Sequence, residues 1–372
     1  MRWLFWCAAG FIAYTYAGYP CWLWIRRRLK PLPVRRAPLT PAVSIVLVVR
    51  NEARVVEAKL RNLLGLDYPD GLREIVIVSD GSTDSTDEIL AGYKQDGRVK
   101  VIAVSQSKGK GAGLNHAVAA ASAEILVFTD ARQQFECGAL RLLVENFADS
   151  TVGCASGELM LGDEATGESS QGMGLYWRIE KLVRELESAS GSVVGATGAI
   201  YAVRRELLAP VPAGTILDDV LIPMNVARKG WRVVFDPRAR AWDSPDLGAE
   251  REFARKVRTL SGNYQLLQLA PWLLSSANPI RFEFVSHKLL RLAVPFGLVV
   301  LFITALVLRH PFYRAAWILQ SAFYGLSLLK VAGLGRGPLA RAADAASTFV
   351  VLNTAALVAF AKFITGRKAA WT

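Results

Sequence analysis

The sequence predicts an α/β protein in which a doubly wound sheet domain is joined to transmembrane helices. Short apolar, β-rich runs at residues 75–78 and 125–129 are typical of buried strands. Helix-like segments alternate with such runs, which favours a parallel sheet. Hydrophobic residues make up 52% of the 372 residues and the mean hydropathy is +0.27, which is high for a soluble protein.

The charge distribution favours a lipid bilayer over nucleic acid as partner. The chain carries 44 Lys and Arg against 32 Asp and Glu, a net charge of +12. Many arginines stand beside apolar segments, namely Arg26, Arg27, Arg28, Arg35, Arg36, Arg336 and Arg341. That placement is typical of cytoplasmic flanks of membrane helices, so we expect no nucleic-acid partner. The four cysteines and three histidines are dispersed, which indicates no zinc site.

Residues 1–29 predict an N-terminal transmembrane anchor. The stretch 3–25 is apolar, and a basic run at 26–30 follows it, which places the next segment in the cytoplasm. A signal peptide is the alternative, but its basic region would be Arg2 alone and no small-residue cleavage site follows. Residues 30–41 contain four prolines and predict an extended linker.

Residues 42–270 contain the predicted sheet domain. The expected elements are strand 43–49, helix 53–64, a strand from residue 75, helix 114–121, strand 125–129, helix 135–146, strand 152–161, loop 162–174, helix 175–188, a small-residue stretch 191–203, helix 216–229 and strand 231–235. Asp80 and Asp130 then follow two strands at the carboxyl edge, where open α/β sheets bind ligands.

A glycine- and lysine-rich stretch between these two aspartates predicts a phosphate site. Gly109, Gly111 and Gly113, with Lys108 and Lys110, form a flexible cationic loop that opens the expected helix. Backbone N–H groups at a helix start, together with lysines, suit a diphosphate. These residues therefore predict a nucleotide-sugar site at the carboxyl edge of the sheet.

Residues 271–372 predict interface helices and about three transmembrane helices. The stretch 271–284 breaks at Pro279 and is expected to lie in the interface plane. Segments long enough to cross the bilayer are residues 289–308, 312–331 and 346–365. With the anchor, these spans place both termini outside and the loop 333–341 in the cytoplasm. Arg367 and Lys368 then lie on the unexpected side, and a re-entrant last segment is the alternative.

Five motifs carry a resemblance to a known family. They are VSIVLVVRNEA at 43–53, VSDGSTDST at 78–86, GKGAGLNHA at 109–117, FTDAR at 128–132 and LDD at 217–219. Their order resembles that of family 2 inverting glycosyltransferases with a GT-A fold, whose membrane-embedded members include cellulose, hyaluronan and exopolysaccharide synthases. The resemblance covers roughly residues 43–268 and implies a nucleotide-sugar donor, most often a UDP-sugar.

The resemblance implies nucleotide-binding roles for three residues. Asp80 is similar to the aspartate that meets the base and ribose, Glu52 to the glutamate after the first strand, and Lys110 to the lysine that contacts the nucleotide. The residues alone leave alternatives open. Asp80 also suits a turn, Asn51 with Glu52 suits a helix start, and Lys108 suits a solvated position.

The resemblance also implies a metal and a base. Asp130 corresponds to the first aspartate of the D-x-D motif, which holds Mg²⁺ or Mn²⁺ on the diphosphate. Arg132 replaces the second aspartate, so Asp130 holds the metal alone or Arg132 itself neutralises the diphosphate; Gln133 is a candidate for the sugar pocket. Asp219 matches the catalytic base with Asp218 as its neighbour, and helix capping is the alternative for this pair.

A third implied motif is eroded in this chain. The Q-x-x-R-W motif of processive synthases corresponds to residues 255–259, where Arg258 matches the diphosphate-binding arginine, Arg255 replaces glutamine and Thr259 replaces tryptophan. The lost tryptophan puts family-style processivity in doubt, and the added arginines are candidates for binding the diphosphate. The aromatic side chains that could instead stack on a sugar, or simply pack in the core, are Tyr176, Trp177 and Tyr264.

These observations together predict a membrane-bound inverting glycosyltransferase of the bacterial inner membrane with a cytoplasmic catalytic domain. It would move a sugar from a UDP-sugar to a growing polysaccharide and form a β-linkage. The first alternative is transfer to a lipid-linked acceptor. The second, of another class, is a nucleotide-binding scaffold that has lost catalysis and supports a synthase complex.

Overall fold

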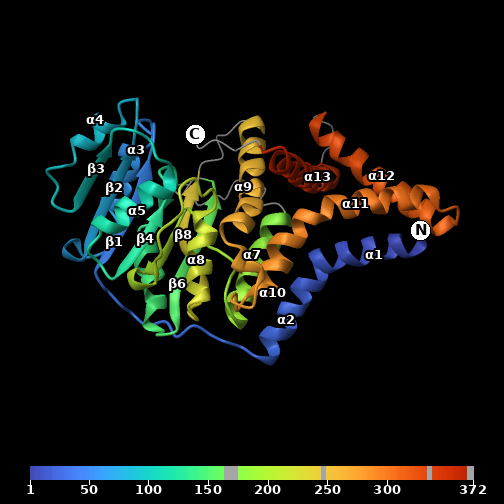
Figure 1. Ribbon diagram of the computed structural model, residues 1–372, viewed down its shortest axis with the longest axis horizontal. Helices are drawn as coiled ribbons and strands as arrows, with labels where there is room; N and C mark the ends of the chain where they lie inside the picture. The colour runs from blue at the N-terminus through green and yellow to red at the C-terminus, as the bar shows by residue number, and fades with distance from the viewer. Residues whose placement is uncertain (163–174, 244–248, 333–336, 367–372) are drawn as a thin grey trace.

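The computed structural model describes residues 1–162, 175–243, 249–332 and 337–366. They form a sheet domain and a group of long helices that extends away from it (Figure 1). The predicted loop 162–174 therefore lies almost entirely outside the described residues.

The described strands form one eight-stranded sheet in the order β3-β2-β1-β4-β7-β6-β8-β5. The strands are β1 (Val43–Val49), β2 (Arg73–Asp80), β3 (Val99–Val104), β4 (Ile125–Thr129), β5 (Gln134–Phe135), β6 (Val152–Leu161), β7 (Tyr201–Arg204) and β8 (Arg232–Asp243). Because β1 pairs in parallel with both β2 and β4, the carboxyl ends of these three strands lie at one edge. The predicted positions of Asp80 and Asp130 at this edge are confirmed.

The expected parallel arrangement is confirmed for β1, β2, β3 and β4, but the whole sheet is mixed, because β7 runs antiparallel to both β4 and β6. The chain reaches β7 through residues 195–198, which lie beside Asp130 and Asp219 at the carboxyl edge. A strand that starts at this edge must run back toward the opposite one. The expected α/β architecture is therefore confirmed with a mixed sheet.

Helices cover both faces of the sheet. In β1, Ile45 and Leu47 enter the core beneath α3 (Val56–Leu64) and α6 (Ala139–Val144), whereas Val46 and Val48 enter the core beneath α5 (Lys110–Ala120) and α8 (Asp218–Arg228). The alternation follows from the two-residue period of a strand. Both faces are apolar because both are buried, as expected for a doubly wound domain. A short helix, α4 (Thr86–Ala91), follows β2.

Two further boundaries differ from the prediction and affect the site. The helix expected at 135–146 begins only at Ala139, because Gln134 and Phe135 form β5 and pair with the end of β8. The strand expected at 231–235 continues to Asp243, since its second half pairs with β6 beyond a bulge. This extension carries Asp243 to the functional edge.

The remaining helices form the extended helical group. They are α1 (Arg2–Ala13), α2 (Tyr19–Leu29), α7 (Leu175–Ser190), α9 (Ala249–Leu269), α10 (Arg281–Phe284), α11 (Leu290–Val307), α12 (Pro311–Val331) and α13 (Pro338–Ile364). A π-helical turn (Tyr14–Gly18) joins α1 to α2, and another (Val285–Leu289) joins α10 to α11. Two 3₁₀ turns, 145–148 and 271–274, follow α6 and α9.

Two helices in the described part of the chain are long and apolar enough to cross a membrane, Arg281–Val307 and Pro338–Ile364. Large apolar side chains on the helical group remain exposed, including Trp3, Trp24, Ile303, Leu306, Ile318, Leu319 and Ile364. Such a surface suits lipid better than water. The predicted spans 3–25 and 312–331 are helical but do not meet the same criterion, and they and the orientation stay predictions.

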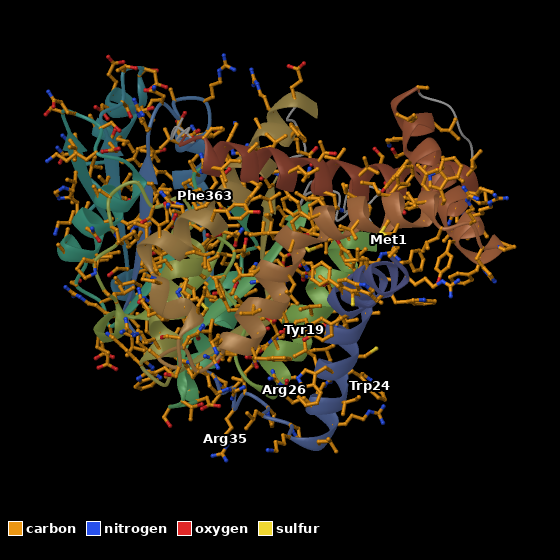
Figure 2. All side chains as sticks on the ribbon, turned by 45° about the vertical axis from the view of Figure 1, so that its right-hand side comes forward. Met1, Tyr19, Trp24, Arg26, Arg35 and Phe363 are labelled. Atoms are coloured by element: carbon orange, nitrogen blue, oxygen red, sulfur yellow. The ribbon has the colours of Figure 1, made fainter. Side chains whose placement is uncertain are left out.

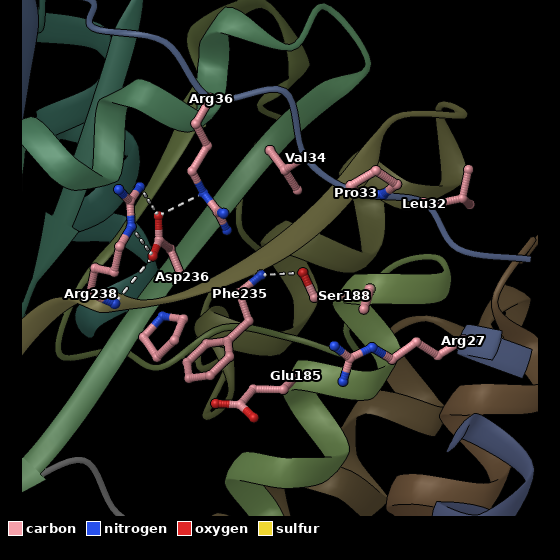
Figure 3. A pocket seen from close by; sticks show the side chains of 12 residues that line it. Arg27, Leu32, Pro33, Val34, Arg36, Glu185, Ser188, Phe235, Asp236 and Arg238 are labelled. Atoms are coloured by element: carbon pink, nitrogen blue, oxygen red, sulfur yellow. Dashed lines mark hydrogen bonds and ion pairs between the residues drawn. The ribbon is translucent and has the colours of Figure 1, made fainter. Parts of the chain in front are cut away.

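The linker lies along the sheet domain and joins it to α2. The Leu32 N–H donates to the Ala189 carbonyl at 2.8 Å, and Arg36 Nε lies 3.1 Å from Asp236 Oδ2. Figure 3 shows the pocket that the linker forms with α7 and β8, where Arg36 and Arg238 both reach Asp236. None of the predicted site residues lines this pocket, so the candidate site lies elsewhere.

Candidate active site

The Asp80 carboxylate fixes the loop that precedes α5. Asp80 is buried at the end of β2 and accepts hydrogen bonds from Ser107 Oγ at 2.7 Å and from the N–H groups of Lys108 and Gly109, each at 2.9 Å. Gly81 follows with a positive φ of 65°, so the chain turns sharply there. Asp80 is therefore a turn residue, as the alternative interpretation expected. It also lies at the carboxyl edge, where the nucleotide-binding role would place it.

Lys110 stands on the first turn of α5 rather than in a flexible loop. The helix starts at Lys110, not at residue 114 as predicted, because Gly109 adopts a φ of 89° that lets the chain enter the helix directly. Farther along, a Cβ on Gly113 would come within 2.6 Å of Val48 Cγ1, so the glycine allows α5 to pack closely on β1. The Lys110 side chain is thus held on a rigid element.

Lys110 joins two of the predicted carboxylates. Its Nζ lies 2.9 Å from Asp130 Oδ1 and 3.1 Å from Asp218 Oδ2. Burial alone favours the neutral amine, but the charges of Asp130 and Asp218 outweigh it and raise the pKa of Lys110. The ammonium therefore stays charged and balances the carboxylates around it.

Asp219 faces Asp130 across the α-carbon of Gly198. Asp219 Oδ2 accepts from the Gly198 N–H at 3.2 Å, and the Asp219 carbonyl accepts from the Ala196 N–H at 2.7 Å. A Cβ on Gly198 would lie 3.1 Å from Asp130 Oδ2 and 3.6 Å from Asp219 Oδ2. Glycine at this position therefore keeps the space between the two carboxylates free.

The environment of Asp219 makes it more basic than an exposed aspartate. Burial, followed by the neighbouring Asp218 carboxylate, raises the pKa of Asp219 to about 6, although Lys110 opposes the shift. Burial also raises the pKa of Asp218, which Lys110 contacts directly. At neutral pH Asp219 is ionised and still able to accept a proton.

Glu52 belongs to the same edge and does not start a helix. The residue before α3 is Val55, so helix capping by Asn51 is wrong. Asn51 instead adopts a φ of 55° and its side chain accepts from the Thr83 N–H at 2.7 Å, which ties the loops after β1 and β2 together. Burial raises the pKa of Glu52, while Arg132 lowers it and Asp130 raises it. Glu52 thus lies within the electrostatic reach of both residues.

Three of the predicted residues lie against Asp243, which the sequence analysis did not identify. Its Oδ2 accepts from Gln133 Nε2 at 2.9 Å and lies 3.9 Å from Arg132 Nη2 and 3.7 Å from Arg255 Nη1. Asp243 is buried at the end of β8. Because β8 was expected to end at residue 235, no signal placed this aspartate at a strand end.

Lys59 is a second missed residue. Its side chain is completely buried, and Nζ donates to Thr129 Oγ1 at 2.8 Å and to the Gln133 carbonyl at 2.5 Å. Burial lowers the pKa of Lys59 to about 7. These bonds fix the turn between β4 and β5 that carries Asp130. A lysine among the buried positions of the amphipathic helix α3 was the available signal.

The remaining predicted residues do not join the cluster. Arg258 is half-buried on α9, and no hydrogen bond or ion pair links it to another site residue in the described part of the chain. Tyr264 stacks on Phe363 of α13 with ring centroids 5.1 Å apart, and Tyr176 lies 6.0 Å from the Arg291 guanidinium. Helix packing accounts for both tyrosines.

The site geometry can be compared with known proteins. Residues 44–210 match the family described as glycosyl transferase family 2. The poly-beta-1,6-N-acetyl-D-glucosamine synthase of Staphylococcus epidermidis is 23% identical over 234 residues, 62% of this chain and 56% of that protein. The synthase of the same name from Staphylococcus aureus is 23% identical over 247 residues, 65% of this chain and 60% of that protein. The aligned part spans little more than half the length of these relatives.

A solved structure matches the fold over nearly the whole chain. The mannosyltransferase PcManGT from Pyrobaculum calidifontis, in complex with GDP-Man and Mn²⁺, has a TM-score of 0.76 at 23% sequence identity. The match covers 98% of this chain and 99% of that one, so it includes the helical group as well as the sheet domain. It confirms the predicted fold.

Proposed function

We propose that this chain is a member of glycosyl transferase family 2, whose model residues 44–210 match, and that it is a membrane-bound inverting glycosyltransferase. It transfers a sugar from a nucleotide sugar, a UDP-sugar, to a growing polysaccharide and forms a β-glycosidic linkage. The observation that carries this proposal is the cluster of Lys110, Asp130, Asp218 and Asp219 at the carboxyl edge of the sheet. The names of the Staphylococcus relatives support a polysaccharide product.

The donor occupies the carboxyl edge between the ends of β2 and β4. Asp80 and Glu52 serve the nucleoside, while Lys110, Arg132 and Arg255 serve the diphosphate. Arg258 lies outside this cluster, and its role at the diphosphate rests on the family resemblance alone. Arg132 and Arg255 both approach Asp243, and Arg132 also lowers the pKa of Glu52. Guanidinium groups match the paired oxygens of a diphosphate.

A divalent cation, Mg²⁺ or Mn²⁺, fits the residues present. The Asp130 side chain is 42% exposed, and Lys110 engages its Oδ1, which leaves Oδ2 for a cation. No group of three or more His, Cys, Asp or Glu side chains in the described residues could hold a metal by itself. A cation held by Asp130 would therefore need further oxygen ligands from outside these side chains. When bound, it would stabilise the negative charge that develops on the leaving diphosphate.

Asp219 acts as the general base in a single displacement. Its carboxylate accepts the proton of the acceptor hydroxyl as that oxygen bonds to the anomeric carbon and the bond to the diphosphate breaks. Attack from the face opposite the leaving group inverts the anomeric centre. During this step Lys110 balances the negative charge of Asp218, and the Gly198 N–H orients the Asp219 carboxylate.

Transfer to a lipid-linked acceptor is the second candidate, and one observation favours it. Thr259 is exposed where processive synthases have a sugar-stacking tryptophan, and Arg255 approaches Asp243. Two of the three aromatic side chains named as replacements, Tyr176 and Tyr264, are engaged in helix packing. Loss of the stacking tryptophan favours adding one sugar over holding a polymer.

The experiment that tests the proposal is diphosphate release by the purified full-length protein with a panel of UDP- and GDP-sugars, with and without EDTA. EDTA-sensitive release with one donor supports a metal-dependent transferase and identifies its donor. Release that survives EDTA would mean that the arginines replace the metal. Nucleotide binding without release, with polysaccharide and polyprenyl-phosphate acceptors supplied, would contradict the proposal.

Activity is expected to fall as the pH drops through about 6. Because the pKa of Asp219 is raised to about 6, the carboxylate is mainly ionised above that pH and protonated below it. A protonated Asp219 cannot accept the acceptor proton, so kcat/KM should decline by about tenfold per pH unit on the acid side. The pH–rate profile measures this, with circular dichroism at each pH as the control for folding. A flat profile down to about pH 5 would count against Asp219 as the base.

Replacing Arg132 with methionine is expected to raise the donor KM by about tenfold to a hundredfold, because charge-assisted hydrogen bonds contribute about 1.5–3 kcal/mol. Steady-state kinetics measure the change, and Arg132→Lys should restore part of it. Arg141→Met is the matched control, since Arg141 pairs with Asp67 on the surface away from the site. Equal donor KM values for Arg132→Met and Arg141→Met would exclude a diphosphate contact.

A further inference from the structure

Helix α7 connects the rest of the helical group to residues 194–198, the loop that holds Asp219. At the centre of the connection is Glu187, which is completely buried. Its Oε1 accepts from the Tyr19 hydroxyl at 2.6 Å and lies 2.8 Å from His287 Nδ1, and its Oε2 accepts from the Val194 N–H at 3.3 Å. Glu187 therefore contacts α2, the π-helical turn that leads into α11, and the start of the loop at the same time.

On the helical side, α7 is tied to the segments before and after the sheet domain. His287 is buried in the π-helical turn that leads into α11, and its Nε2 lies 2.9 Å from Glu180 Oε1. Arg291 of α11 pairs with Glu180 as well. In Figure 2, Tyr19 lies on the side of α2 that meets the domain, whereas Trp24 points outward. Buried polar groups of this kind are costly unless fully paired, so they define how the helices pack on α7.

On the catalytic side, α7 holds residues 194–198 at a second point. Ser156 Oγ accepts from Arg184 Nη2 at 2.7 Å and from the Thr197 N–H at 3.1 Å. The next residue, Gly198, donates to Asp219 Oδ2 at 3.2 Å, and Ala196 donates to the Asp219 carbonyl at 2.7 Å. The loop that orients Asp219 is therefore fixed by Glu187 at one end and by Ser156, through Arg184, in its middle.

The loop has little freedom to absorb a shift of α7. Gly195 adopts a φ of 88°, and a Cβ there would come within 3.0 Å of Val220 Cγ2 on α8. A closely packed segment with hydrogen bonds on both sides passes a displacement on to the groups it holds. A shift of α7 should therefore reach the Asp219 carboxylate.

We propose that Glu187 and Ser156 are positioning residues for Asp219, and that contacts from α2 and the π-helical turn, through Tyr19 and His287, set the position of α7 and so the rate of sugar transfer. The proposal rests on the role of Asp219 as the base. It predicts that a residue of the N-terminal helical segment affects a reaction at the opposite side of α7. The donor-binding residues Asp80 and Arg132 are not part of this connection.

The test compares two tyrosines of the helical group in the full-length protein. Tyr19→Phe removes the hydroxyl that contacts Glu187, whereas the control Tyr324→Phe removes a hydroxyl that accepts from Gln320 Nε2 at 2.7 Å within α12. Tyr19→Phe and Ser156→Ala should lower kcat by about two- to thirtyfold with unchanged donor KM and unchanged UDP affinity. Tyr324→Phe should leave kcat unchanged. Equal kcat values for Tyr19→Phe, Ser156→Ala and the control would overturn the proposal.

A second comparison separates positioning from general destabilisation. In an Asp219→Asn background the base is absent, so adding Ser156→Ala should not lower the residual rate further. A further loss of the same size in that background would contradict a role through Asp219. If Asp219→Asn alone left turnover unchanged, Asp219 would not be the base and the proposed function would fail. Equal kcat values for the positioning variants and the control would instead overturn only the positioning role.

Discussion

Replacement of Asp219 by asparagine is expected to lower kcat by about a hundredfold to ten-thousandfold, the range typical of losing a general base. Asparagine has nearly the same volume and can still accept the Gly198 N–H hydrogen bond, so the loop and α8 should remain folded. It cannot take the acceptor proton. Turnover is measured by diphosphate release with the identified donor, and UDP affinity by calorimetry should change little.

The matched control is Asp67→Asn, since Asp67 pairs with Arg141 on the surface and lies outside the cluster. The same variant separates an enzyme from a scaffold. If the protein only bound nucleotide and supported a synthase complex, a cell that carries Asp219→Asn would keep its polysaccharide. Loss of product in the cell together with intact nucleotide binding would exclude the scaffold.

Replacement of Asp130 by asparagine should lower kcat/KM by about a hundredfold to a thousandfold and remove the stimulation by Mg²⁺ or Mn²⁺. The reason is that a carboxylate binds a hard cation much more tightly than a neutral amide oxygen does, and the cation's stabilisation of the leaving group amounts to several kcal/mol. Activity is titrated against each metal for the wild type and the variant. The Asp130→Asn variant should fold like the wild type, because Lys110 keeps Asp218 as a partner. Circular dichroism checks this.

Two results would separate the metal from the arginines. A variant that is inactive at every metal concentration supports Asp130 as a metal ligand. If Asp130→Asn kept most of its activity and the wild type ignored EDTA, the diphosphate would be neutralised by Arg132 and Arg255 instead. In that case replacement of Arg132 or Arg255 should cause the large loss of kcat/KM.

The sequence predicted much of the candidate site because three of its members are fixed by simple rules. Asp80 and Asp130 follow strands that flank β1 in parallel, so their positions at one edge were determined once the strands were recognised. Asp218 stands on the first turn of a helix whose start carries aspartates. Lys110 was expected in a flexible loop, and only the structure places it on the first turn of α5. The family resemblance then supplied roles that spacing alone could not.

The missed features depend on tertiary contacts that spacing does not encode. β8 extends to Asp243 because its second half pairs with β6 and β5, although the sequence PRARAW is a weak strand signal. The antiparallel direction of β7 follows from where residues 195–198 lie. Tyr264 was a candidate sugar platform until its ring was found against α13.

The contacts of Asp80 have a consequence for how the donor arrives. This carboxylate accepts three hydrogen bonds from residues 107–109, two at Oδ2 and one at Oδ1, and its two oxygens offer about four acceptor positions. A uracil or ribose group that binds Asp80 would therefore use the one remaining position at Oδ1 or displace a bond of the loop. Because one such bond contributes little net energy, nucleotide affinity should come chiefly from the diphosphate end, and the base end should act as a selector that admits only groups that fit beside the loop.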